Sequence, residues 1–231
     1  MSDPESPDAT LMPSLGKLVR GLSALFWGLP IALVVGIQSA KTDWLAPFGI
    51  FPMVIANSIL FFGLNQLGHF RTQERIWVLA VDKTKLLGLI NLGLSPFVCW
   101  WHRLPHIPLF AWSVGLLAIT SIIFLIYLNF ALQRLAAMLP DETMRYETQL
   151  FTNLNCTILV CTLLLLTLIL VIFQLDPTLK LGFSLRFLLE RMNLWLLVLL
   201  VLLPVATTMA LIWKIKETIL RSIFGSGASL F

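Results

Sequence analysis

Residues 107–130 read IPLFAWSVGLLAITSIIFLIYLNF and contain no acidic, basic or histidine residue. A helix of about 20 apolar residues is long enough to cross the hydrocarbon core of a bilayer. The whole chain has the same character, because 58% of its 231 residues are hydrophobic, 12% are charged and its mean hydropathy is +0.89. Soluble domains carry about 25% charged residues, so lipid is the expected solvent of this chain.

The length of the apolar runs separates the two structures that can span a bilayer, helices and closed barrels. Barrel strands are about ten residues long and alternate apolar with polar side chains, whereas the runs here are unbroken and about twice as long. We therefore predict an all-α, polytopic integral membrane helical bundle. Its six predicted transmembrane spans are residues 18–38, 47–67, 86–101, 107–130, 151–175 and 192–213.

The ends of the chain differ from this transmembrane domain, which we place at residues 15–221. Residues 1–14, MSDPESPDATLMPS, are acidic and rich in Pro and Ser, so we expect a short disordered cytoplasmic tail. Residues 222–231 end in GSGASLF and are expected to form a flexible C-terminal tail. The N-terminal tail lacks the basic segment of a secretory signal. Lys17 and Arg20 do precede the first apolar run, but Ile37 makes Gln38-Ser39-Ala40 a poor cleavage site, which indicates a retained first helix.

Basic residues fall unevenly on the two sides of the predicted membrane. One side receives Lys17, Arg20, Arg71, Arg75, Lys83, Lys85, Arg134, Arg145, Lys214, Lys216 and Arg221. The other side receives Lys41, Arg103, Lys180, Arg186 and Arg191. Because Lys and Arg are enriched in cytoplasmic connections, this bias predicts that both termini face the cytoplasm.

Two cytoplasmic connections are amphipathic. Residues 68–85 place Phe70, Trp77 and Val81 on one helical face, which is typical of an interfacial helix on the inner leaflet. Residues 132–155 read LQRLAAMLPDETMRYETQLFTNLN, where Pro140 breaks one helix and acidic residues favour the start of the next. A cytoplasmic docking surface is predicted at Arg71, Glu74, Arg75, Asp141, Glu142 and Arg145.

Small residues recur every fourth position in the first predicted span, at Ala24, Gly28, Ala32, Gly36 and Ala40. Such a seam lets helix backbones approach closely in lipid, and its partner helix can belong to the same chain or to another. Polar side chains at membrane depth include Asn57 and Asn91. They are expected to form interhelical hydrogen bonds or, as the alternative, to line a path for a polar solute.

No sequence motif points to catalysis. No Asp, Glu, Lys, Arg or His lies in the middle third of a predicted span, which disfavours a proton relay through the membrane. His102 and His106 are separated by Pro105, which breaks the helix that would align them on a metal, so both are expected to be solvated. We therefore predict no catalytic residues, no metal site, no cofactor and no nucleic-acid partner.

The first functional expectation is a non-enzymatic scaffold or accessory subunit of a membrane complex, in contact with membrane lipids. Other subunits, a second copy of the chain or a soluble cytoplasmic protein are the expected partners, and a bacterial cytoplasmic membrane is the expected location. The alternative is a permease. Six spans, an amphipathic cytoplasmic element after the second and a helical outer insertion at 176–191 resemble the membrane half of ABC-type exporters. That resemblance implies a separate ATPase that docks near residues 68–85.

Overall fold

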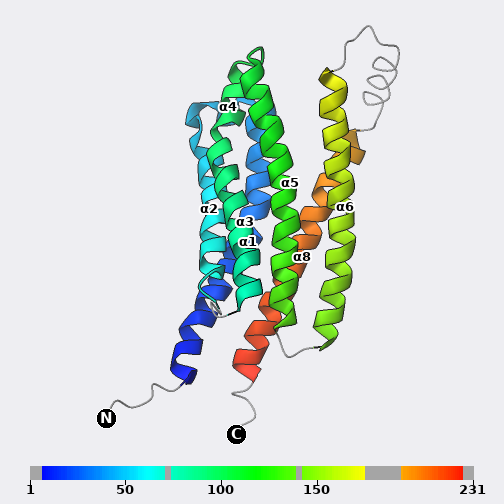
Figure 1. The fold of residues 1–231 in the computed structure, drawn as a ribbon. Coiled ribbons are helices and arrows are strands. Elements are labelled where there is room, and N and C mark those ends of the chain that lie inside the picture. Colours follow the sequence, from blue (N-terminus) through cyan, green and yellow to red (C-terminus); the bar gives the residue numbers. More distant parts are fainter. Residues whose placement is uncertain (1–6, 71–73, 139–141, 175–193, 226–231) are drawn as a thin grey trace.

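The computed structural model describes residues 7–70, 74–138, 142–174 and 194–225. Within these ranges all regular structure is helical. The long helices are α1 (Pro7–Lys41), α2 (Phe51–Leu67), α3 (Arg75–Leu94), α5 (Pro108–Ala137), α6 (Glu142–Gln174) and α8 (Leu194–Gly225). Two shorter helices, η1 (Asp43–Phe48) and α4 (Pro96–Arg103), lie at the opposite end of the bundle from the termini (Figure 1).

Three helices in the described part of the chain are long and apolar enough to cross a membrane. These segments are Ser14–Lys41, Pro108–Ala137 and Arg145–Leu168, and α2 is a shorter apolar helix. Leu, Ile and Phe side chains also remain exposed on the outside of the bundle, as at Phe62, Leu116 and Leu164. The chain is therefore a helical bundle with the length and composition of an integral membrane protein, as predicted.

The third predicted span, residues 86–101, needs a correction. α3 begins at Arg75 and ends at Leu94, and α4 starts anew at Pro96. Pro lacks a backbone N–H and fits the first turn of a helix, so α3 ends before Pro96 and α4 begins there. The residues expected to lie flat on the inner leaflet are thus the first half of a bundle helix.

The prediction that residues 68–85 bury their apolar face in the inner leaflet is wrong, because another helix of the same chain covers that face. Trp77 and Val81 are fully buried and pack in one cluster with Leu132 and Leu135 of α5. The Trp77 indole Nε1–H donates to the Phe70 carbonyl at 2.8 Å. An apolar helix face is buried equally well by lipid or by another helix, and here the same chain supplies the helix.

Both tails are shorter than predicted. α1 starts at Pro7, so residues 7–14 form helix, and Pro is favoured at the first helical position. α8 continues to Gly225, so residues 222–225 are helical too. The predicted outer insertion at 176–191 lies outside the described residues.

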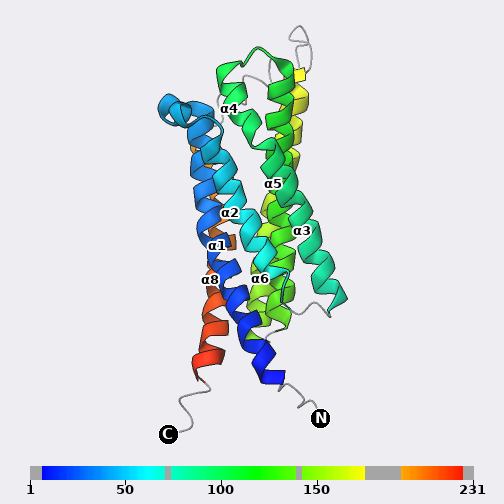
Figure 2. The same cartoon turned by 90° about the vertical axis from the view of Figure 1, so that its left-hand side faces the viewer.

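The bundle is packed unequally along its length. In the half that holds the termini, a continuous cluster joins α1, α2, α3, α5 and α8 through buried side chains such as Leu22, Leu64, Trp77, Leu132 and Ile212. The other half has a small cluster of Met53, Val98 and Leu117. Figures 1 and 2 show α4 and the start of α5 at this second end, far from both termini.

Candidate functional site

The less densely packed half of the bundle holds a cavity of about 500 Å³. Side chains from α1, α2, α3, α4, α5, α6 and α8 line it, among them Leu29, Ala32, Gly36, Met53, Leu117 and Leu166. The volume falls within the ~300–1,000 Å³ of small-molecule sites, which also tend to lie between the helices of a bundle. The cavity thus has the size and position of such sites, and its lining is mostly apolar.

The small-residue seam of α1 divides into two parts. A side chain at Gly28 would meet Leu60 of α2 within 2.8 Å, so the helices touch there. Further along, Ala32, Gly36 and Ala40 border the cavity, and a Cβ at Gly36 would have only Met53 near it, at 3.9 Å. Ala24 is half-buried. Small side chains bring two helices together in one half and leave space in the other.

α1 and α2 also approach each other closely at residues outside the predicted seam. Gly21 of α1 and Gly63 of α2 face each other, since a Cβ at Gly21 would lie 2.8 Å from the Gly63 carbonyl oxygen. Gly63 lies in the second predicted span, residues 47–67. Pairing it with Gly21 requires the relative register of α1 and α2, which only the structure supplies.

Three polar side chains on the cavity wall form hydrogen bonds within the protein. Asn57 Nδ2 donates to the Met53 carbonyl at 3.0 Å, and Thr162 Oγ1 donates to the Ile158 carbonyl at 2.8 Å. Asn91 of α3 accepts a 2.7 Å hydrogen bond from Thr120 of α5. The last contact is the interhelical bond expected of Asn91. These bonds leave a wall that favours an apolar occupant.

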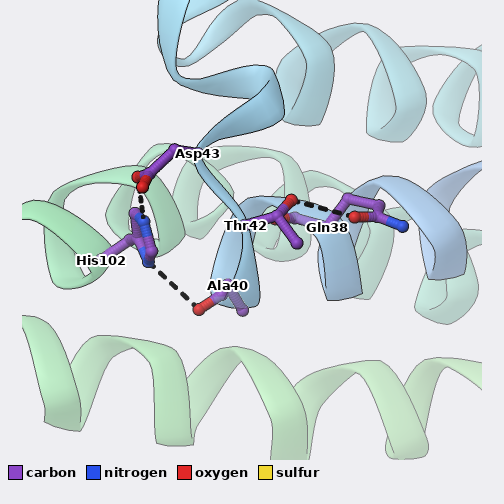
Figure 3. Close-up of polar contacts among 5 residues, drawn as sticks. All are labelled: Gln38, Ala40, Thr42, Asp43 and His102. Atoms are coloured by element: carbon purple, nitrogen blue, oxygen red, sulfur yellow. Dashed lines mark hydrogen bonds and ion pairs between the residues drawn. The ribbon is translucent and has the colours of Figure 1, made fainter.

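Figure 3 shows polar contacts that join α4 to the end of α1, next to Ala40, which borders the cavity. His102 of α4 lies between the Ala40 carbonyl, 3.2 Å from Nδ1, and the Asp43 carboxylate, 2.9 Å from Nε2. Both partners are acceptors, so each hydrogen bond is donated by a ring N–H of His102. His102 is thus bonded rather than solvated, and it joins α4 to the end of α1 beside Lys41, which lines the cavity.

A buried polar cluster crosses the densely packed half between α5, α6 and α8. Asn155 Nδ2 lies 3.1 Å from Asn129 Oδ1, 2.9 Å from Thr208 Oγ1 and 3.3 Å from the Pro204 carbonyl. Asn129 Nδ2 also donates to Thr208 Oγ1 at 2.9 Å. The sequence alone did not point to Thr208, because no spacing within α8 distinguishes it from its neighbours. We call Asn129, Asn155 and Thr208 the amide cluster.

Four of the predicted docking residues, Glu74, Arg75, Glu142 and Arg145, lie at the end that holds the termini. The other two, Arg71 and Asp141, are outside the described residues. Arg75, Glu142 and Arg145 are exposed and Glu74 is half-buried at the start of α3. Arg145 Nη2 donates to the Ala137 carbonyl at 2.8 Å, so this side chain also connects the end of α5 to the start of α6.

In the described part of the chain no group of three or more His, Cys, Asp or Glu side chains is arranged to hold a metal ion. The fold is a helical bundle with three helices long and apolar enough to cross a membrane, and an apolar cavity lies between its helices. Comparison with known protein families, with curated proteins and with solved structures gives no match for this chain. The functional argument therefore rests on the geometry alone.

Proposed function

We propose that this protein is a multi-pass, non-enzymatic membrane protein of the transport class, which binds an apolar molecule in the cavity between its helices. The observation that supports this proposal is the cavity itself, about 500 Å³ in volume and bordered by all of the long described helices. The cavity is partly open to the outside of the bundle, which gives a ligand a route into it. The proposed role is that of a permease subunit.

The placement of the seam favours this proposal over a scaffold. A seam that recruits another chain must present its small residues outward. Here Gly28 contacts Leu60 of the same chain, while Ala32 and Gly36 border the cavity. The seam residues therefore pack against this chain's own helix or border its cavity, and they are not presented to another chain.

Proton-driven transport is disfavoured by the lining. Among the described residues that border the cavity, Lys41 at its outer end is the one ionisable side chain. Proton relays through membranes need Asp, Glu or His within the span. An apolar ligand that moves without a coupled proton fits this lining better.

A scaffold or accessory subunit remains the second candidate, favoured by the exposed charges of Arg75, Glu142 and Arg145. A soluble cytoplasmic partner, such as an ATPase, would dock there. Purification in mild detergent separates the two roles. A stoichiometric larger complex that forms equally well when the cavity is filled supports the scaffold.

For the topology we propose six spans with both termini in the cytoplasm of a bacterial cell. Among the described residues, the end with the termini holds Lys17, Arg20, Arg75, Lys83, Lys85, Arg134, Arg145, Lys214, Lys216 and Arg221. The opposite end holds Lys41 and Arg103. That bias supports the orientation.

The topology is tested with single cysteines in a chain whose Cys99, Cys156 and Cys161 have been replaced. His106→Cys should react with an impermeant thiol reagent from outside the cell, and Arg145→Cys only in inverted vesicles. Labelling of both from the same side would show that the two ends of the bundle face one compartment, and the proposed topology would be wrong.

The binding role is tested with an uncharged apolar fluorophore whose emission rises in a dry site. Gly36→Leu should abolish saturable binding, because the new side chain projects into the cavity. Gly93→Leu is the matched control, since Gly93 is exposed and a Cβ there meets nothing within 4 Å. Equal binding by the two variants would refute a ligand site in this cavity.

A further inference from the structure

The depth of the cavity matches one leaflet of a bilayer. Along α1 its lining runs from Lys41 to Leu29, twelve residues apart. At 1.5 Å per residue that is about 18 Å, while half of a hydrocarbon core is about 15 Å. A molecule that fills the cavity from end to end therefore has the length of one acyl chain in its leaflet.

The outer end of the cavity lies at the height expected for lipid headgroups. α1 ends at Lys41, which closes the apolar segment Ser14–Lys41. Trp44 follows and is 75% exposed, and Trp is enriched at membrane–water interfaces. A chain that lies in the cavity would thus hold its polar end in the same layer as neighbouring lipids.

Charge at this end favours an anion. Lys41 is exposed and borders the cavity, and Arg103 lies in the last turn of α4 nearby. The nearest carboxylate, Asp43, is paired with His102. A ligand headgroup would therefore pair with the Lys41 ammonium, because Lys attracts anionic headgroups.

We infer that the ligand is a fatty-acid anion, with its acyl chain between Lys41 and Leu29 and its carboxylate at the Lys41 ammonium. This inference rests on the proposed binding function and specifies its substrate class. The volume of about 500 Å³ lies in the lower half of the small-molecule range, which fits one chain rather than a two-chain lipid. Transport would then carry the fatty acid across or out of the leaflet next to Lys41.

The test uses the full-length protein in vesicles of neutral phospholipid. The probes are a long-chain fatty acid with a nitroxide near its methyl end and the methyl ester of the same molecule, at a pH that ionises the acid. Electron paramagnetic resonance should show a saturable immobilised component for the acid. The ester should bind about fivefold more weakly, which is the effect of one Lys on an anionic headgroup.

Two pairs of variants complete the test. Lys41→Gln should remove the preference for the acid over the ester, while Arg103→Gln, which removes a charge at the same end but outside the cavity lining, should keep most of it. Gly36→Leu should remove the immobilised component of both probes, and Gly93→Leu should keep it.

The outcomes distinguish the two proposals. If acid and ester bind equally and Lys41→Gln changes neither, the fatty-acid assignment is wrong and a headgroup-independent apolar site remains. If Gly36→Leu retains an acid component equal to that of Gly93→Leu, the acyl chain lies elsewhere and this inference fails. If Gly36→Leu and Gly93→Leu also bind the uncharged fluorophore equally, the proposed binding function itself is overturned.

Discussion

Replacing Asn155 by Leu should weaken the contact of α6 with α5 and α8. The Asn155 amide nitrogen has two hydrogens and three acceptors within 3.3 Å, one on Asn129 and two on α8. At most two of these hydrogen bonds form at once. Leu has a similar size, so the change removes hydrogen bonds with little loss of packing.

The free energy of unfolding should fall by about 1–3 kcal/mol. Interhelical hydrogen bonds in membrane proteins contribute about 0.6 kcal/mol on average and up to ~1.7, and two are lost. Asn129 Oδ1 then loses its donor, at a cost of about 1–3 kcal/mol. The Asn155 Oδ1 atom, however, is buried without a hydrogen-bond partner, so its removal returns an amount of the same size.

The measurement is reversible unfolding in mixed micelles, with Asn153→Leu as the control. Asn153 is on the same helix but exposed, so its substitution should change the unfolding free energy by less than about 0.5 kcal/mol. The double variant Asn129→Leu/Asn155→Leu should lose at least ~0.5 kcal/mol less than the sum of the single variants, because contacting residues couple. Additive losses, or equal stability of the Asn155 and Asn153 variants, would refute the amide cluster.

Three further substitutions test the packing of α1 and α3. Gly21→Ala should destabilise the protein by about 1–3 kcal/mol, because the new Cβ lies 2.8 Å from the Gly63 carbonyl oxygen and the helices must separate. Gly16→Ala, where nothing lies within 4 Å, should instead gain up to ~1 kcal/mol of helix propensity, and both are measured by the same unfolding assay. Trp77→Phe should cost about 1–2 kcal/mol through the lost hydrogen bond to the Phe70 carbonyl, and hydrogen exchange should then rise at the start of α3; unchanged exchange would contradict that bond.

Uninterrupted apolar runs and helix-start signals were readable from the sequence because they are local. The spans at 18–38, 107–130 and 151–175 correspond to helices that are long and apolar enough to cross a membrane. α6 begins at Glu142, where acidic residues after Pro140 predicted a helix start. Each of these features depends on neighbouring residues in the chain, so no knowledge of the tertiary structure is needed.

The errors arose where an apolar face has two possible neighbours. In lipid, the face carrying Trp77 and Val81 can be covered by acyl chains or by another helix, and the amphipathic pattern is the same in both cases. α5 covers it here. The contact between α3 and α5 determines the direction in which α3 runs, and therefore the length of the third predicted span. The amphipathic pattern does not contain this information.

The small-residue seam of α1, which reaches the candidate site, also has surroundings that depend on the neighbouring helices. Its four-residue spacing is uniform, yet Gly28 contacts α2 while Gly36 borders a cavity. The difference lies in the other helices, since the amide cluster and the leucine-rich contacts join them in one half of the bundle. Helices held together at one end can separate at the other with little loss of contact. That arrangement favours entry of a ligand at the Lys41 end, where the proposed fatty acid would bind.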